Sequence, residues 1–322
     1  MPLPASFGRI VRVLALPLAC ALPGWSAADA PPQDRRIAIT IDDLPMASAT
    51  PATMAEMQRV HEALRAALAR HGARAVGFVN EDRLYRPGEF DPGVALLDRW
   101  LAAGMELGNH GFGHPSLWKL PLERYQDAVV QGEPISRWLS AQRGVPYRYY
   151  RHPYTQTGKT EAEKAQFEAF LAARGYEVAP MTVDHDDYLF ACIHDKGTAE
   201  DRARLAPAYQ QHLEHALDSY ESMSVQLFER PIAQILLIHA NRLNADTLDQ
   251  TLDTLERRGY RFITLEEALR DPAYRTPDAA SGRFGPSWLT RWAKSLKRKL
   301  TRYGHDDPTG WVAERHRALC GG

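Results

Sequence analysis

Two hydrophobic patterns alternate along residues 36–270. Short apolar runs typical of buried strands are each followed by a longer segment whose apolar residues recur every three or four positions, as on one face of a helix. The helical pattern is plainest in residues 51–72, where Val60, Leu64 and Leu68 share a face. The clearest strands are predicted at 36–41, 73–80, 105–110 and 232–239, and 147–154 is predicted as a strand that runs into a polar turn. This alternation predicts an α/β fold on a parallel sheet, either a barrel or a doubly wound sheet.

Polar side chains recur at or just past the C-terminal ends of these strands. In a (β/α) barrel the active site is built on that face of the sheet. The shared placement therefore favours a barrel with a catalytic site over a set of unrelated polar caps. The residues concerned are Asp42, Asp43, His110, Arg151, Asp184 and His239.

His110 and His114 lie four residues apart, a spacing that brings two imidazoles to one side of a helical or turn-like segment. Together with one strand-end aspartate they form a set of two histidines and one carboxylate. Such a set binds zinc or another divalent first-row metal and leaves positions open for water and substrate. The simpler alternative is that both histidines only face solvent.

Composition and the N-terminus bear on location and partners. The 322 residues are 44% hydrophobic and carry a net charge of −1, which gives no reason to expect a nucleic-acid partner. Residues 1–28 combine a basic start, a short apolar run and small residues before a cleavage site, as in a secretory signal peptide. We therefore expect a periplasmic or secreted protein, with lipoprotein anchoring at Cys20 as the second choice. Sequence alone does not decide whether Cys192 and Cys320 pair.

Five motifs, in order, give the chain a resemblance to the polysaccharide deacetylase family, the NodB-homology group of metal-dependent carbohydrate esterases. The resemblance covers residues 36–270 and implies a distorted (β/α) barrel of parallel strands. With it we expect a signal peptide at 1–28, a catalytic domain at 29–270 and a C-terminal extension at 271–322. The motifs are TIDDLP (family T-F-D-D-G-P), NHGFGH (H-[ST]-x-x-H), RHPY (R-P-P-Y), DHDDY (D-x-x-D-W) and LIH (L-x-H).

The resemblance implies separate roles for the two adjacent aspartates. Asp43, His110 and His114 would be the metal ligands, with Zn²⁺ expected first and Co²⁺, Mn²⁺ or Ni²⁺ as alternatives. Asp42 would be the general base that takes a proton from water. Arg151 would hold Asp42 ionised, because an adjacent cation lowers the pKa of a carboxyl group.

The same resemblance implies that His239 is the general acid that protonates the departing amine. Asp184 or Asp187 would favour its protonated form, and we prefer Asp184. The backbone N–H of Tyr154 would stabilise the oxyanion. Tyr188 stands where the family has tryptophan and would keep an aromatic wall.

The implied reaction is hydrolysis of N-acetyl groups on an amino-sugar glycan. Leu44, His152 and Thr155 replace glycine, proline and glycine of the family motifs, which leaves the chemical groups intact but the substrate open. One alternative is a metal-dependent amidohydrolase acting on a small non-sugar amide. Another is a non-catalytic glycan-binding relative, which would be expected to have lost the base, the acid or the ligands.

Residues 286–303 form a basic amphipathic pattern beyond the family resemblance. One interpretation is contact with an anionic membrane surface or an acidic glycan. The preferred alternative is that the apolar stripe packs on the barrel and leaves its charges in solvent. The stripe consists of Trp288, Leu289, Trp292, Leu296 and Leu300.

Overall fold

The computed structural model describes residues 1–2, 34–283, 285–301, 308 and 310–321. The expected signal peptide, apart from its first two residues, and Cys20 lie outside this part of the chain. Among the described residues, no helix combines the length and the apolar character needed to span a membrane.

The described strands form one parallel sheet in the order β5-β4-β3-β2-β1-β7-β6, and β8 pairs with the beginning of β1. Their bounds are β1 Arg35–Leu44, β2 Ala75–Val79, β3 Glu106–Asn109, β4 Tyr149–Tyr150, β5 Glu177–Val178, β6 Val183–Asp184, β7 Gln234–His239 and β8 Tyr260–Ile263. In this part of the chain no ladder joins β5 to β6, so the barrel is open there. The predicted fold, a distorted (β/α) barrel of parallel strands, is confirmed.

Strand β1 is central because it pairs along both edges. Ile37 and Ile39 both pair with β7, while on the other edge Ile37 pairs with β8 and Ile39 with β2. Ile37, Ile39 and Ile41 belong to one buried cluster, and Ala38 between them belongs to a second. A strand buried on both faces reads as a nearly continuous apolar run, as this one does.

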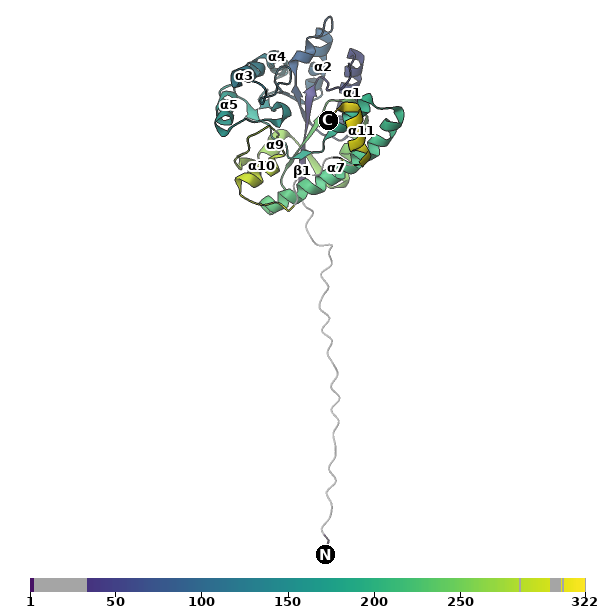
Figure 1. Cartoon of the computed structure of the whole chain (residues 1–322), viewed down its shortest axis with the longest axis vertical. Coiled ribbons are helices and arrows are strands. Elements are labelled where there is room, and N and C mark those ends of the chain that lie inside the picture. The colour runs from purple at the N-terminus through teal and green to yellow at the C-terminus, as the bar shows by residue number, and fades with distance from the viewer. Residues whose placement is uncertain (3–33, 284, 302–307, 309, 322) are drawn as a thin grey trace. The chain divides into compact units, whose positions relative to one another are not determined.

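Helices surround the sheet (Figure 1). They are α1 Met54–Arg70, α2 Phe90–Ala102, α3 Leu122–Gln131, α4 Pro134–Arg143, α5 Glu161–Ala173, α6 Asp187–Lys196, α7 Ala199–Phe228, α8 Arg242–Arg257, α9 Leu265–Leu269, α10 Trp288–Ser295 and α11 Gly310–Cys320. The predicted face of α1 is buried, and a capping box of Thr53 and Glu56 starts the helix.

Two of these helices were not predicted. Helix α6 begins at Asp187, inside the DHDDY motif, and α11 lies in the C-terminal extension. A disulfide between Cys192 and Cys320 joins them, with the Cα atoms 6.4 Å apart. The covalent link ties the end of the chain to the helix that follows the acidic motif.

The apolar stripe of the amphipathic segment packs on the barrel, as the preferred alternative had it, but Arg291 of the same segment is buried and does not face solvent. Among the described residues of this segment, 286–301, only Trp288–Ser295 is helical, and Trp288, Leu289 and Trp292 are buried. The ring of Trp292 makes T-shaped contacts with the rings of Phe228 of α7 and Tyr274. These three side chains of the stripe are therefore not available to a membrane or a glycan, whereas Leu296 is 40% exposed. The interpretation of 286–303 as a membrane or glycan contact stays a prediction.

Candidate active site

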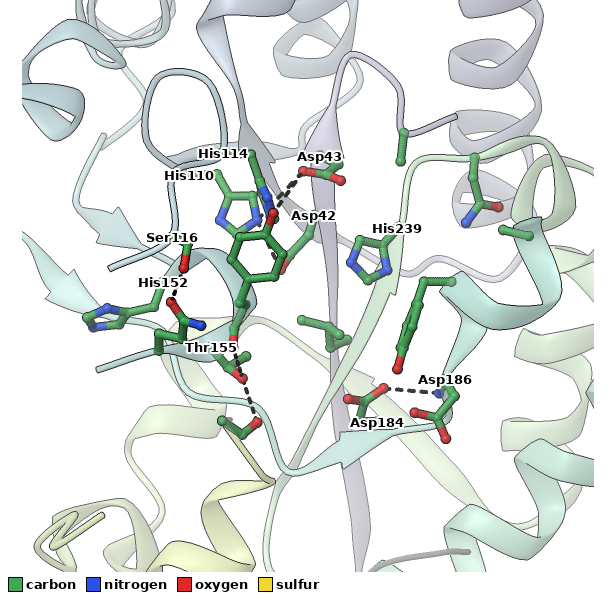
Figure 2. A pocket seen from close by; sticks show the side chains of 18 of the residues that line it. Asp42, Asp43, His110, His114, Ser116, His152, Thr155, Asp184, Asp186 and His239 are labelled. Atoms are coloured by element: carbon green, nitrogen blue, oxygen red, sulfur yellow. Dashed lines mark hydrogen bonds and ion pairs between the residues drawn. The ribbon is translucent and has the colours of Figure 1, made fainter. Parts of the chain in front are cut away.

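The strand ends meet around one cavity of about 1160 Å³. Asp42 and Asp43 come from the end of β1, and His110 directly follows β3. His239 closes β7, beside Asp42 on the neighbouring strand. Figure 2 shows the two aspartates and His110 gathered on one side of the cavity, with His239 facing them. Polar residues that are far apart in the sequence are thus brought together by the parallel sheet.

Asp43, His110 and His114 form a candidate metal-binding set. One carboxylate oxygen of Asp43 lies 3.8 Å from Nε2 of His110 and 3.8 Å from Nε2 of His114. All three ligand atoms lie within 4.8 Å of one another. Nδ1 of His110 lies 2.8 Å from the carbonyl oxygen of Arg151, a contact that turns Nε2 towards Asp43.

Two further residues hold Asp43, and sequence reasoning missed both. Nδ2 of Asn80 donates to Oδ1 of Asp43, and Arg83 lies 3.4 Å from Oδ2. Arg83 also donates to the carbonyl oxygen of Asp43, whose backbone has a left-handed φ of 70°. Asn80 directly follows β2, so the strand-end rule that selected the other residues could have selected it.

The protonation states of these groups suit metal binding. Burial lowers the pKa of His110 and of His114 to about 4, so both imidazoles are neutral at neutral pH. Burial opposes ionisation of Asp43, but Arg83 and the two histidines outweigh it and hold the pKa of that carboxyl well below its usual range. Neutral imidazoles and an ionised carboxylate are the forms that bind a divalent metal.

Asp42 has a different environment. Burial raises the pKa of Asp42, against the opposing effect of Arg151 and then His239. Its Oδ2 lies 3.7 Å from Nη1 of Arg151 and 3.7 Å from Nε2 of His110. Among the described residues, its Oδ1 has no hydrogen-bond partner. A buried carboxylate with a raised pKa and one open oxygen is a better proton acceptor than its neighbour.

Arg151 lies behind Asp42 and is itself buried. Nη2 donates to Oγ1 of Thr40 at 2.9 Å, and the guanidinium lies 4.8 Å from the centre of the Phe78 ring. These contacts hold the cation beside Asp42.

The carboxylate paired with His239 is that of Asp187, so the preference for Asp184 was wrong. Oδ1 of Asp187 lies 2.7 Å from Nδ1 of His239. Asp186 adopts a left-handed φ of 54° immediately before α6, and this turn directs Asp187 to the histidine. Asp184 lines the cavity and accepts a hydrogen bond from the backbone N–H of Asp186 (Figure 2).

This pairing decides the charge of His239. Burial by itself would lower the pKa of His239, but Asp187, with smaller contributions from Asp43 and Asp42, raises it to about 10. The imidazole is therefore a proton donor at neutral pH, with Nδ1 held by Asp187.

A buried hydrogen-bond chain holds Asp187 from behind. Nδ2 of Asn244 donates to Asp187 at 2.6 Å and to the carbonyl oxygen of His239 at 2.8 Å. The hydroxyl of Tyr209 donates to Oδ1 of Asn244 at 2.7 Å, and His185 lies 2.7 Å from that hydroxyl. Neither Asn244 nor Tyr209 was predicted, because their role depends on contacts between α7, α8 and the acidic motif.

Tyr154 and Tyr188 line the cavity on different sides. Their side chains are 55% and 53% exposed, unusual for large aromatics. The ring of Tyr154 lies 4.5 Å from that of His114, and the ring of Tyr188 lies 6.5 Å from that of His239. Exposed aromatic rings at a cavity offer flat apolar surfaces to a ligand.

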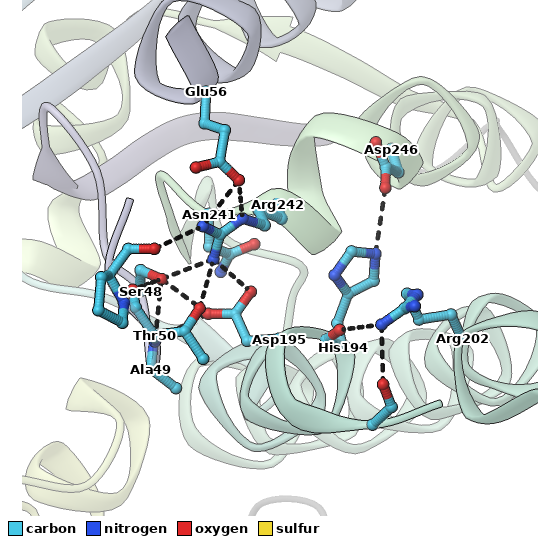
Figure 3. Close-up of polar contacts among 12 residues, drawn as sticks. Ser48, Ala49, Thr50, Glu56, His194, Asp195, Arg202, Asn241, Arg242 and Asp246 are labelled. Carbon is cyan, nitrogen blue, oxygen red and sulfur yellow. Dashed lines mark hydrogen bonds and ion pairs between the residues drawn. The ribbon is translucent and has the colours of Figure 1, made fainter. Parts of the chain in front are cut away.

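A further polar network fixes the loop that follows Asp43. Asp195 of α6 accepts from the backbone N–H of Ala49 at 2.8 Å and from the hydroxyl of Ser48 at 3.0 Å. Arg242 pairs with Asp195 at 3.0 Å and with Glu56 at 3.0 Å (Figure 3). Ser48, Ala49 and Asp195 line the cavity, so this network shapes one of its walls.

Comparison with known proteins gives a consistent set of matches. Residues 29–170 match the polysaccharide deacetylase family. The peptidoglycan-N-acetylglucosamine deacetylase PgdA of Listeria monocytogenes serotype 1/2a (strain 10403S) is 24% identical over 235 residues, which are 73% of this chain and 39% of the relative. The chain thus spans about two fifths of the length of the curated relatives it matches.

Two solved structures are also similar to this chain. The peptidoglycan deacetylase PdaC from Bacillus subtilis is 22% identical, with a TM-score of 0.48, and the match covers 74% of this chain and 93% of that one. A family 4 carbohydrate esterase from Streptomyces lividans, in complex with acetate, is 17% identical with a TM-score of 0.45, covering 73% and 96% of the two chains.

Proposed function

Because residues 29–170 match the polysaccharide deacetylase family, we propose that this protein is a metal-dependent hydrolase that removes N-acetyl groups from an amino-sugar glycan. The observation that carries the proposal is the contrast between Asp42 and Asp43. The pKa of one carboxyl group is raised and the pKa of its neighbour is lowered, as a base and a ligand require.

The residues present fit a divalent metal. Asp43, His110 and His114 offer one carboxylate and two neutral imidazoles within 4.8 Å of one another, and the contact of His110 with a backbone carbonyl sets its orientation. When bound, such a metal polarises an acyl oxygen and lowers the pKa of water. We propose Zn²⁺ first, with Co²⁺, Mn²⁺ or Ni²⁺ as alternatives, because the ligand types suit all four.

The chain's own groups then divide the proton transfers. Asp42 takes a proton from the attacking water while the oxygen of that water bonds to the acetyl carbon. Arg151 remains beside Asp42. The C–N bond breaks as His239 gives its proton to the departing nitrogen. We propose that the backbone N–H of Tyr154 stabilises the developing oxyanion. Acetate and a free amine leave.

The exposed aromatics favour a sugar substrate over a small non-sugar amide. Tyr154 and Tyr188 present open rings near the candidate ligands and near His239, respectively. Sugar rings expose C–H faces that can lie against such surfaces, whereas a small amide needs few of these contacts. A non-catalytic glycan-binding role finds less support, since the chain retains the residues that we propose as base, acid and metal ligands.

We also propose that the protein is exported. The N-terminal pattern at residues 1–28 supports a signal peptide. The disulfide between Cys192 and Cys320 supports an oxidising compartment.

The test is acetate release by the zinc-loaded protein, residues 29–322. The panel contains N-acetylchitooligosaccharides, peptidoglycan fragments and a simple aryl acetamide, each with and without chelator. We expect chelator-sensitive release from a glycan. Release from the aryl acetamide alone would support the small-amide alternative, and glycan binding with no release and no bound metal would support the non-catalytic one.

A further inference from the structure

The turn that carries Tyr154 into the cavity has an unusual backbone. Tyr154 and Thr155 have φ angles of 55° and 50°, both in the left-handed region that favours glycine. Thr155 is β-branched, for which this conformation is especially unfavourable, and it stands where the family motif has glycine. Such a turn persists only where surrounding contacts hold it.

Those contacts come from the C-terminal extension. Nη2 of Arg291 donates to the carbonyl oxygen of Thr155 at 2.6 Å, and Nη1 donates to Oγ1 of Thr157 at 3.0 Å. Oγ1 of Thr155 donates to the carbonyl oxygen of Gly285 at 2.5 Å. A Cβ at Gly285 would lie 1.9 Å from Oγ1 of Thr155, so only glycine allows this approach.

Arg291 is itself firmly placed. It is 2% exposed, and its Nη1 lies 3.1 Å from Oδ2 of Asp278. Its Nε donates to the carbonyl oxygen of Pro286 at 2.9 Å, and its guanidinium lies 4.0 Å from the centre of the Trp288 ring. Asp278 also pairs with Lys164 of α5 at 2.6 Å, so its carboxylate keeps a partner if Arg291 is replaced.

The turn and the extension form one wall of the cavity. Tyr154, Thr155, Gly285 and Pro286 all line it, and the ring of Tyr154 packs against His114. A shift of the turn would therefore move a cavity wall next to a candidate metal ligand.

We infer that Arg291 is a positioning residue that holds the Tyr154–Thr155 turn against the cavity. Its hydrogen bonds stabilise a left-handed backbone that glycine at position 155 would adopt more easily. The inference deepens the proposed function and rests on it for the effect on turnover. The effect on the turn itself is independent of what the protein hydrolyses.

The test compares Arg291→Met in two backgrounds, with threonine or glycine at position 155. With threonine, we expect kcat for acetate release to fall about tenfold or more, because small displacements in an active site have large effects on rate. Zinc content should not change. Hydrogen exchange of backbone amides in 153–158 should speed up. With Thr155→Gly, Arg291→Met should reduce kcat and raise exchange much less, because glycine adopts the turn unaided.

Two further variants sharpen the test. Gly285→Ala pushes on Thr155 without removing a buried charge and should also raise exchange in 153–158. Arg298→Met removes an arginine of the same extension whose side chain is 49% exposed, and should change neither exchange nor kcat.

Equal losses in both backgrounds, or unchanged exchange in 153–158, would overturn the inference. If the unmodified protein releases no acetate from any probe, the proposed function fails. Exchange in 153–158 then still supports or overturns the role of Arg291.

Discussion

At the scale of single residues, the adjacent aspartates differ in what surrounds them. Asp43 meets Asn80, Arg83 and two histidines, while Asp42 meets Arg151 and keeps one buried oxygen without a hydrogen-bond partner among the described residues. Asp43 has a left-handed backbone, and of the neighbours named for the two side chains only His110 lies near both carboxylates. Identical residue types thus acquire opposite pKa shifts within one strand end.

Asp187→Asn tests the pairing of His239. Removing the carboxylate takes away the main group that raises the pKa of His239, so that pKa should fall. A general acid works only while protonated, and the alkaline limb of the kcat profile should therefore move to lower pH. We also expect kcat to fall by about 10²-fold or more. Asp184→Asn is the matched comparison, and an equal or larger shift of the alkaline limb in that variant would contradict the assignment.

At the scale of elements, helix α6 connects several parts of the site. It begins with Asp187 and Tyr188, carries Cys192 in the disulfide, and fixes the loop after Asp43 through Asp195. One helix thus links the carboxylate that pairs with His239, an exposed tyrosine at the cavity and helix α11. Sequence reasoning missed this helix because its start depends on the backbone turn at Asp186.

Cys320→Ser tests the link between α6 and α11. Losing a crosslink that closes a loop of 128 residues should lower the free energy of unfolding by about 2–4 kcal/mol. Urea unfolding, monitored by tryptophan fluorescence under non-reducing conditions, measures this difference. Reduced unmodified protein should match the variant. Unchanged stability in both would show that the bond contributes nothing to the native state.

At the scale of the whole molecule, zinc should stabilise the protein through the candidate ligands. A ligand at a hundred times its Kd adds about 2.7 kcal/mol to the free energy of unfolding. We expect zinc to raise the Tm of the unmodified protein and of His71→Ala, which alters a separate cluster of potential ligands at the surface. His114→Ala should lose this response. A Tm shift that persists in His114→Ala would place zinc elsewhere.

The sequence was sufficient to predict the parallel sheet and the candidate site residues at the ends of its strands. Hydrophobic alternation predicts parallel strands, and parallel strands bring Asp42, His110 and His239 to one edge. The sequence was not sufficient to predict contacts between segments that are far apart in the chain. The choice of Asp187 over Asp184 depends on one left-handed residue, and Arg291 meets Thr155 across 136 positions of chain. Neither contact can be recognised from the residues next to it in the sequence.

The most direct test of the central claim compares Asp42→Asn with Asp43→Asn, measuring bound zinc and acetate release from an N-acetylated glycan on the same samples. The distinct roles of the two aspartates predict that Asp42→Asn keeps its zinc and loses turnover, whereas Asp43→Asn loses both. An Asp42→Asn protein that still releases acetate, or an Asp43→Asn protein that binds zinc as tightly as the unmodified chain, would contradict the account.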